Sequence, residues 1–179
     1  MTTQTSVAMF LDSLSNLPAW SLPPGYEMRS LHPGDEHAWE RIIAKSFQEV
    51  YLFAECIAKH EQYVPEKVWF VTYDNVPVAT ATAWYTNKFP EDTGCLHMVG
   101  NLPEHTGKGL GKQVSLAALH KMRLEGRSQA MLNTDVFRLP AIKTYLNLGF
   151  RPRIIDDSHY ERWKTVAEKL KDKRLELFD

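Results

Sequence analysis

The stretch that decides the fold is Val99-Gly-Asn-Leu-Pro-Glu-His-Thr-Gly-Lys-Gly-Leu-Gly111, in which glycines alternate at positions 107, 109 and 111. Apolar residues then recur at every third or fourth position from Leu110 to Met122, which predicts an amphipathic helix that Gly126 ends. A loop that opens a helix leaves backbone N–H groups unpaired at the positive end of the helix dipole. We therefore expect a phosphate-binding loop, with Lys108 and Lys112 adding positive charge. From the glycine spacing alone, a tight loop with surface lysines is the alternative.

Two other kinds of phosphate-binding loop do not match this stretch. A Walker A loop needs a glycine where Thr106 stands, and a hydroxyl residue where Gln113 follows Gly111-Lys112. A dinucleotide-binding loop needs its third glycine at position 112, where lysine stands. A nucleotide-binding domain of either type is therefore disfavoured.

Composition restricts the class of protein further. The chain has 179 residues, which suits one domain, and its 21 Lys+Arg against 22 Asp+Glu give a net charge of −1. No overall field favours nucleic acid or an anionic membrane. Cys56 and Cys95 are too far apart in sequence to suggest a disulfide framework or a thiolate metal site. No secretory signal or membrane-spanning stretch is recognisable, so we expect a cytoplasmic protein.

Periodicity along the chain predicts an α/β domain built on a mixed sheet. Residues 1–25 form an extension, with a short helix over Val7 to Leu14 and a proline-rich linker, and residues 26–179 form the domain. The dipeptide Asp74-Asn75 predicts a tight hairpin. The expected strands are 26–31, 68–73, 76–85, 96–99, 130–134 and 150–155, and the expected helices are 35–47, 51–60, 110–122, 139–148 and 161–175.

Two segments resemble the GCN5-related N-acetyltransferase (GNAT) family. The stretch from Val99 to Gly111 is similar to its acyl-CoA-binding segment, and Ala141-Ile-Lys-Thr-Tyr-Leu-Asn-Leu-Gly-Phe150 is similar to its second motif. The resemblance covers about Tyr26 to Ile155. It implies a sheet of about six strands, with an antiparallel first half and a central parallel pair, 96–101 and 130–134, that splays apart around the pantetheine arm.

The resemblance also implies acetyl-CoA as co-substrate and a set of residues that bind it. The backbone around Val99 and Asn101 would bind pantetheine, and the amides of 106–111 would bind the pyrophosphate. The full set of expected CoA-binding residues is Val99, Asn101, Thr106, Gly107, Lys108, Gly109, Leu110, Gly111, Lys112 and Arg138.

Three features depart from the family. Thr106 stands where the family has Arg or Gln, and Arg138 stands where its second motif commonly has Asn. Arg138 would either contact a CoA phosphate or pair with Asp135. The family ends in a β-hairpin, whereas a helix is predicted here after the last strand, so a seventh strand would be missing or very short.

Acyl transfer from a thioester needs a neutral amine, an oxyanion partner and a proton for the leaving thiolate. Tyr145 is the candidate acid, because a phenol can protonate a thiolate and the family has a tyrosine beside the sulfur. Helical packing beside Leu148 is the alternative for Tyr145. His97 is the candidate base, with a structural hydrogen bond as its alternative.

Other residues could serve the acceptor. Glu49, Glu55 and Asp135 are charged groups expected near it, and each is also explained as a solvated or structural charge. Trp69, Trp84 and Tyr85 could line the pocket, although adjacent strand residues such as Trp84 and Tyr85 face opposite sides.

The sequence thus predicts an N-acetyltransferase that acts on a primary amine of a small molecule or a peptide. The alternative is a non-catalytic domain that binds or senses acyl-CoA. The fold is compatible with a homodimer.

Overall fold

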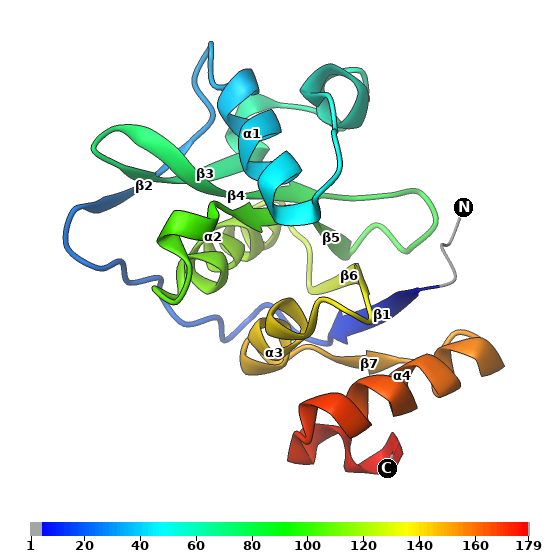
Figure 1. Cartoon of the computed structure of the whole chain (residues 1–179). Coiled ribbons are helices and arrows are strands. Elements are labelled where there is room, and N and C mark those ends of the chain that lie inside the picture. Colours follow the sequence, from blue (N-terminus) through cyan, green and yellow to red (C-terminus); the bar gives the residue numbers. More distant parts are fainter. Residues whose placement is uncertain (1–4, 179) are drawn as a thin grey trace.

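A computed structural model describes residues 5–178; residues 1–4 of the predicted extension and residue 179 lie outside the described part. Its centre is a seven-stranded sheet in the order β2-β3-β4-β5-β6-β1-β7 (Figure 1). The strands are β1 Ser6–Leu11, β2 Tyr26–Ser30, β3 Val68–Tyr73, β4 Val76–Trp84, β5 Thr93–Asn101, β6 Gln129–Asp135 and β7 Arg151–Arg153. The longer helices are α1 Glu36–Phe47, α2 Leu110–Leu124, α3 Leu139–Asn147 and α4 Asp157–Leu170.

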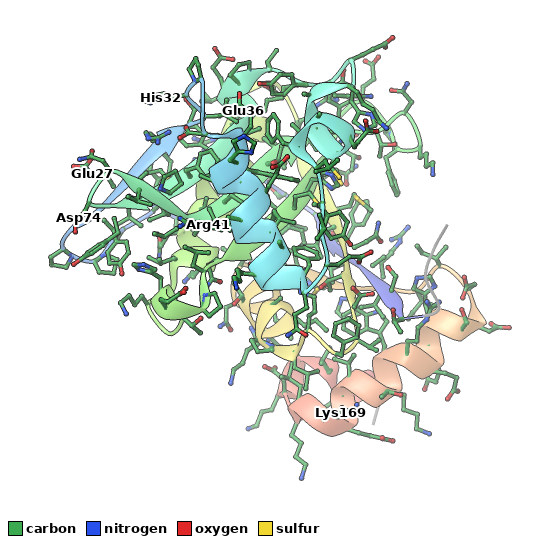
Figure 2. The ribbon with its side chains drawn as sticks, turned by 45° about the horizontal axis from the view of Figure 1, so that its top comes forward. Glu27, His32, Glu36, Arg41, Asp74 and Lys169 are labelled. Carbon is green, nitrogen blue, oxygen red and sulfur yellow. The ribbon has the colours of Figure 1, made fainter. Side chains whose placement is uncertain are left out.

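Helices α1 and α2 cover opposite sides of the β3–β4–β5 part of the sheet (Figure 1). Strand β4 is therefore buried on both faces from Pro77 to Ala83. Helix α4 packs on β1 through Trp163, Val166 and Ala167. Figure 2 shows the outward-facing charges on these layers, with Glu27 and Asp74 near the β2–β3–β4 edge and Lys169 on α4.

The predicted fold class is confirmed. Strands β2 to β5 pair antiparallel, and β5 and β6 form the parallel pair. Asp74 and Asn75 close the β3–β4 hairpin with φ angles of 49° and 66°, the left-handed conformation that a two-residue hairpin loop needs. The predicted helix at 51–60 is reduced to a short π-helix, Ala54–Ala58.

The parallel pair splays apart, as the resemblance to the family implied. Strands β5 and β6 pair only at Thr93–Gln129, Gly94–Ala130 and Cys95–Met131. Beyond Cys95 the two strands separate, and β5 continues to Asn101 paired with β4 only. The splay therefore opens toward the glycine-rich loop.

A β-bulge bends β5 beside this opening. The register against β4 shifts between Thr80 and Thr82, and Met98 has a φ of 49°. A positive φ is uncommon for a side chain of this size, and an extra residue on one strand turns the backbone that follows it. The bulge therefore changes the direction of the side chains that lead to Val99.

The predicted N-terminal helix is wrong, because residues 6–11 form strand β1. This strand pairs antiparallel with β6 along its whole length and with β7 on its other side. Val7, Met9 and Leu11 alternate at the period of a strand and are buried. Burial between two strands thus outweighs the helical spacing of Val7 and Leu14, and the sheet has seven strands instead of about six.

The C-terminal end agrees with the predicted departure from the family. The last predicted strand, 150–155, is shortened to β7 at Arg151–Arg153. It leads into α4, which begins at Asp157 instead of the expected 161. Asp156 caps this helix by accepting a hydrogen bond from the His159 N–H. A closing hairpin would give β7 its partner strand; here β1 fills that place from the other end of the chain.

Truncating Met9 to alanine tests the place of β1 in the sheet. Met9 is fully buried in β1, so Met9→Ala is expected to lower the free energy of unfolding by about 2–5 kcal/mol in urea titrations. The exposed Asp12, just after the strand, gives the control Asp12→Ala. Equal stabilities of the two variants would contradict a structural role for β1.

None of the helices in residues 5–178 combines the length and apolar character needed to cross a lipid bilayer.

Candidate functional site

The glycine-rich loop presents unpaired backbone amides, although one residue fewer than predicted. The Thr106 N–H donates to the carbonyl of Pro103 at 3.1 Å, and the Lys112 N–H donates to that of Gly109 at 3.1 Å. The amides from Gly107 to Gly111 have no hydrogen-bond partner among residues 5–178. They lie at the N-terminus of α2, where the helix dipole favours an anion.

The loop needs glycine for its backbone conformation. Gly107 and Gly109 have φ angles of 81° and 73°, which L side chains rarely adopt. A Cβ atom at either position would meet no other atom within 4 Å. Glycine is therefore required at these positions by the backbone conformation and not by lack of space. A loop in which every second residue has a positive φ angle turns successive N–H groups toward a common point.

Asn101 fastens the end of β5 to the loop. Its side-chain amide donates to the Leu102 carbonyl at 3.1 Å and to the Thr106 hydroxyl at 3.4 Å. Thr106, which stands where the family has a longer side chain, thus serves as a hydrogen-bond acceptor within the loop.

The loop borders a cavity of about 740 Å³ between α1, the splayed end of β5, the start of α2 and α3. Lys108 is not among the residues that line it. The other predicted CoA-binding residues and Tyr145 do line it, namely Val99, Asn101, Thr106, Gly107, Gly109, Leu110, Gly111, Lys112, Arg138 and Tyr145.

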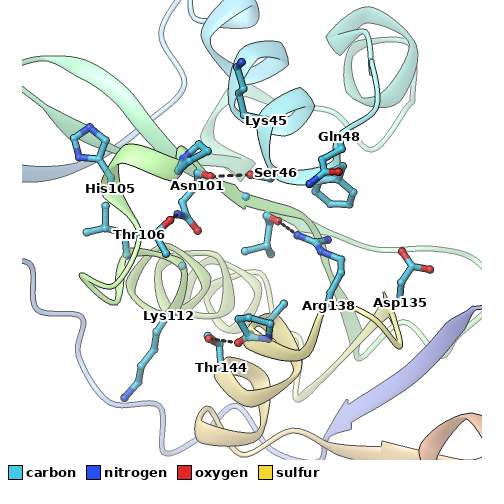
Figure 3. A pocket seen from close by; sticks show the side chains of 18 of the residues that line it. Lys45, Ser46, Gln48, Asn101, His105, Thr106, Lys112, Asp135, Arg138 and Thr144 are labelled. Atoms are coloured by element: carbon cyan, nitrogen blue, oxygen red, sulfur yellow. Dashed lines mark hydrogen bonds between the residues drawn. The ribbon is translucent and has the colours of Figure 1, made fainter. Parts of the chain in front are cut away.

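The last turn of α1 forms the opposite wall, which sequence reasoning missed. The Ser46 hydroxyl donates to the Asn101 carbonyl at 2.9 Å (Figure 3). A Cβ atom on Gly100 would lie 2.6 Å from the Ser46 Oγ atom, so only glycine allows this approach. The contact brings Lys45 and Phe47 to the cavity. The glycine at position 100 is the sequence feature that permits this close approach of α1 to β5.

The two ends of the cavity differ in charge. In Figure 3, His105, Thr106 and Lys112 lie on one side, Asp135 lies on the other, and Arg138 lies between them. Lys112 at the loop end suits an anion. Glu49 also lines the cavity, and Tyr51, whose hydroxyl donates to Glu49, lies close enough to Asp135 to be affected by its charge.

Arg138 crosses the splay toward β5. Its guanidinium donates to the Val99 carbonyl at 3.4 Å and lies 3.9 Å from the centre of the Phe47 ring. Of the two partners considered for it, Asp135 forms no ion pair with Arg138 among the described residues. The contact with a CoA phosphate stays a prediction.

Tyr145 lies on α3, and its surroundings are compatible with both roles considered for it, packing in the core and proton donation. Its ring packs edge-on against Phe150 with centroids 6.1 Å apart, and 4% of the residue is exposed. Burial raises the pKa of Tyr145 to about 12, and the positive charge of Arg138 opposes part of this rise. The phenol therefore stays protonated at neutral pH, and Tyr145 lines the cavity.

The structure does not bring His97 to the cavity. Its ring lies beside Trp84, with centroids 5.7 Å apart, and it is not a lining residue. In a regular strand His97 and Val99 would share a face, but the bulge at Met98 shifts the alternation by one residue.

Only two of the other predicted acceptor-side residues line the cavity. Glu49 accepts a hydrogen bond from the Tyr51 hydroxyl at 2.8 Å, and Asp135 accepts one from the Thr5 hydroxyl at 2.8 Å. The exposed Glu55 pairs with Lys59 instead. The predicted aromatic lining is not formed by Trp69, Trp84 and Tyr85, none of which borders the cavity.

His97 gives the fold a pH dependence that can be measured. Burial, and secondarily the charge of His60, lower the pKa of His97 from 6.5 to about 4. A histidine whose pKa is lowered by folding stabilises the fold above its unfolded pKa. The free energy of unfolding is therefore expected to fall between pH 6.5 and about 4, by up to about 1.4 kcal/mol per pH unit.

His97→Gln should flatten this part of the curve in urea titrations at a series of pH values. The slope, and not the absolute stability, is the quantity compared. The same slope in both proteins would show that His97 titrates normally.

Comparisons with known proteins agree with this geometry. The sequence matches the model of the acetyltransferase (GNAT) family over residues 36–150. It is 29% identical over 150 residues to a mycothiol acetyltransferase from Thermomonospora curvata, covering 79% of this chain and 50% of the relative. It is 30% identical over 151 residues to the mycothiol acetyltransferase from Renibacterium salmoninarum, covering 78% of this chain and 45% of that relative. The chain thus spans about half the length of these curated relatives.

Solved structures support the same fold. A GCN5-related N-acetyltransferase from Sphaerobacter thermophilus superposes with a TM-score of 0.65 at 20% identity, over 83% of this chain and 48% of that one. The ribosomal-protein-S18-alanine N-acetyltransferase from Escherichia coli superposes with a TM-score of 0.60 at 20% identity, over 72% of this chain and 79% of that one. Because the family model matches well over half of the chain, across both motifs and the cavity between them, this chain belongs to the acetyltransferase (GNAT) family.

Proposed function

We propose that this protein transfers an acetyl group from acetyl-CoA to the primary amine of a small molecule or peptide, by direct attack of the amine. The observation that carries the proposal is the row of unpartnered amides from Gly107 to Gly111, which borders the same cavity as Tyr145. Anion-binding amides at one end and a protonated phenol deeper in the cavity suit a long donor that carries phosphates and a thioester.

The loop residues hold the donor. The unpaired amides and Lys112 bind the pyrophosphate, and Leu110 and Gly111 present the first turn of α2 to it. The splayed end of β5 leaves backbone groups near Val99 without a β6 partner, which suits pairing with the amide groups of pantetheine. One such backbone N–H can stabilise the oxyanion.

Side chains of this chain move the protons. The amine nitrogen forms its bond to the acetyl carbon and gives the oxyanion, and the carbon–sulfur bond breaks when the oxyanion collapses. Tyr145 gives its proton to the departing sulfur. Glu49 or Asp135, the carboxylates that line the cavity, takes the proton that the amine nitrogen loses, directly or through water.

Release of free thiol from acetyl-CoA, measured with a panel of primary amines, tests this function. Release that depends on an amine, with the acetylated amine found by mass spectrometry, is the expected result. A domain that only binds or senses acyl-CoA would be stabilised against heat by CoA and would release no thiol with any amine. That result would replace the enzyme with the binding domain.

A further inference from the structure

Arg138 carries a positive charge that no carboxylate neutralises. A guanidinium has five N–H donors, and the structure gives this one a single long hydrogen bond, to the Val99 carbonyl at 3.4 Å. Stacking over the Phe47 ring at 3.9 Å holds the group in the cavity. No carboxylate of residues 5–178 lies within ion-pair distance of it. Most of its donors are therefore available to a ligand.

The same cavity holds two carboxylates whose charge is also not neutralised. Glu49 and Asp135 each accept a hydrogen bond from a neutral hydroxyl, that of Tyr51 and that of Thr5. Neither forms an ion pair within the described part of the chain. The cavity thus contains a positive group, Arg138, and two negative groups, Glu49 and Asp135, that form no ion pair with one another.

We infer that the acceptor is an amine that also carries a carboxylate, as an amino acid does; this inference rests on the proposed function. The carboxylate of the acceptor binds the guanidinium of Arg138, and its ammonium group binds Glu49 and Asp135 before it loses a proton to one of them. Bond making and breaking are those given above, since the carboxylate takes no part in the transfer. An amine without a carboxylate would leave Arg138 unpaired in a half-buried position, which disfavours its binding.

The rim of the cavity suggests which amino acids to try. Phe137 lines the cavity and is 65% exposed, which leaves an apolar surface for the side chain of an acceptor. Leucine and phenylalanine are therefore suitable probes, each compared with the amine that lacks its carboxylate, 3-methylbutylamine and 2-phenylethylamine.

The experiment measures kcat/KM for each pair of acceptors by thiol release. We expect the carboxylate to raise kcat/KM about 10- to 100-fold in the natural protein. Arg138→Gln should reduce this ratio to near one, and Arg138→Lys should restore part of it because the charge remains. The matched control is Arg127→Gln, which removes a half-buried arginine stacked on Tyr85 at 4.7 Å, outside the cavity, and should leave the ratio unchanged.

Three results would overturn the inference. The first is equal or better acetylation of the amines without a carboxylate, or of a peptide N-terminus. The second is an equal loss for both members of a pair in Arg138→Gln together with weaker acetyl-CoA binding, which would assign Arg138 to the donor. The third is no thiol release with any amine although CoA binds; this alone would also remove the proposed function.

Discussion

Tyr145→Phe is expected to lower kcat about 100-fold, because it removes the proton donor for the departing thiolate. The phenyl ring keeps its edge contact with Phe150. No hydrogen bond contributes to the raised pKa of the Tyr145 hydroxyl, so little stability should be lost with it. Binding of acetyl-CoA, measured by calorimetry, should change little. An unaltered kcat would leave Tyr145 with a packing role only.

The pH profile adds an independent check on Tyr145. An ordinary tyrosine ionises near pH 10, but burial raises the pKa of this one to about 12. The protonated phenol is the working form, so its ionisation should not lower kcat below pH 10. Tyr63→Phe is the control variant, because Tyr63 packs against Phe53 and does not line the cavity.

Gly109→Ala is expected to weaken CoA binding about 100-fold. Alanine is disfavoured at a φ of 73°, by about 1–2 kcal/mol. The loop would relieve this strain by turning its backbone away, and the bonds of its amides to the pyrophosphate would be lost, each worth about 1.5–3 kcal/mol because the acceptor is charged. Isothermal calorimetry with CoA measures the change directly.

Gly126→Ala separates lost binding from general strain. Gly126 follows α2 with a φ of 85°, and a Cβ atom there would also meet no atom within 4 Å. Both variants therefore carry the same kind of backbone strain, but only Gly109 lies at the cavity. Equal CoA affinity in the two variants would contradict a phosphate-binding role for the loop.

Local features of the sequence predicted much of the fold and the glycine-rich loop. Asp74-Asn75 specified the hairpin, and the glycines at 107 and 109 specified the loop, because each requirement lies within a few neighbouring residues. Helices α2 and α3 followed from apolar periodicity that agrees with their burial.

Features set by distant contacts could not be predicted in this way. Residues 7–14 fit both a helix and a strand, and the choice depends on pairing with β6 and β7, more than a hundred residues further along the chain. The bulge at Met98 moved His97 away from the cavity. The hydrogen bond from Ser46 to Asn101 brings α1 to the site, and the spacing of apolar residues does not predict such a contact.

The most direct test of the account follows the amides of residues 107–111 by nuclear magnetic resonance while CoA is added. The N–H signals of Gly107, Gly109 and Gly111 should shift strongly and exchange more slowly with solvent, whereas that of Gly126 should not. Binding of CoA that leaves the three loop glycines unchanged and perturbs amides elsewhere would contradict the account.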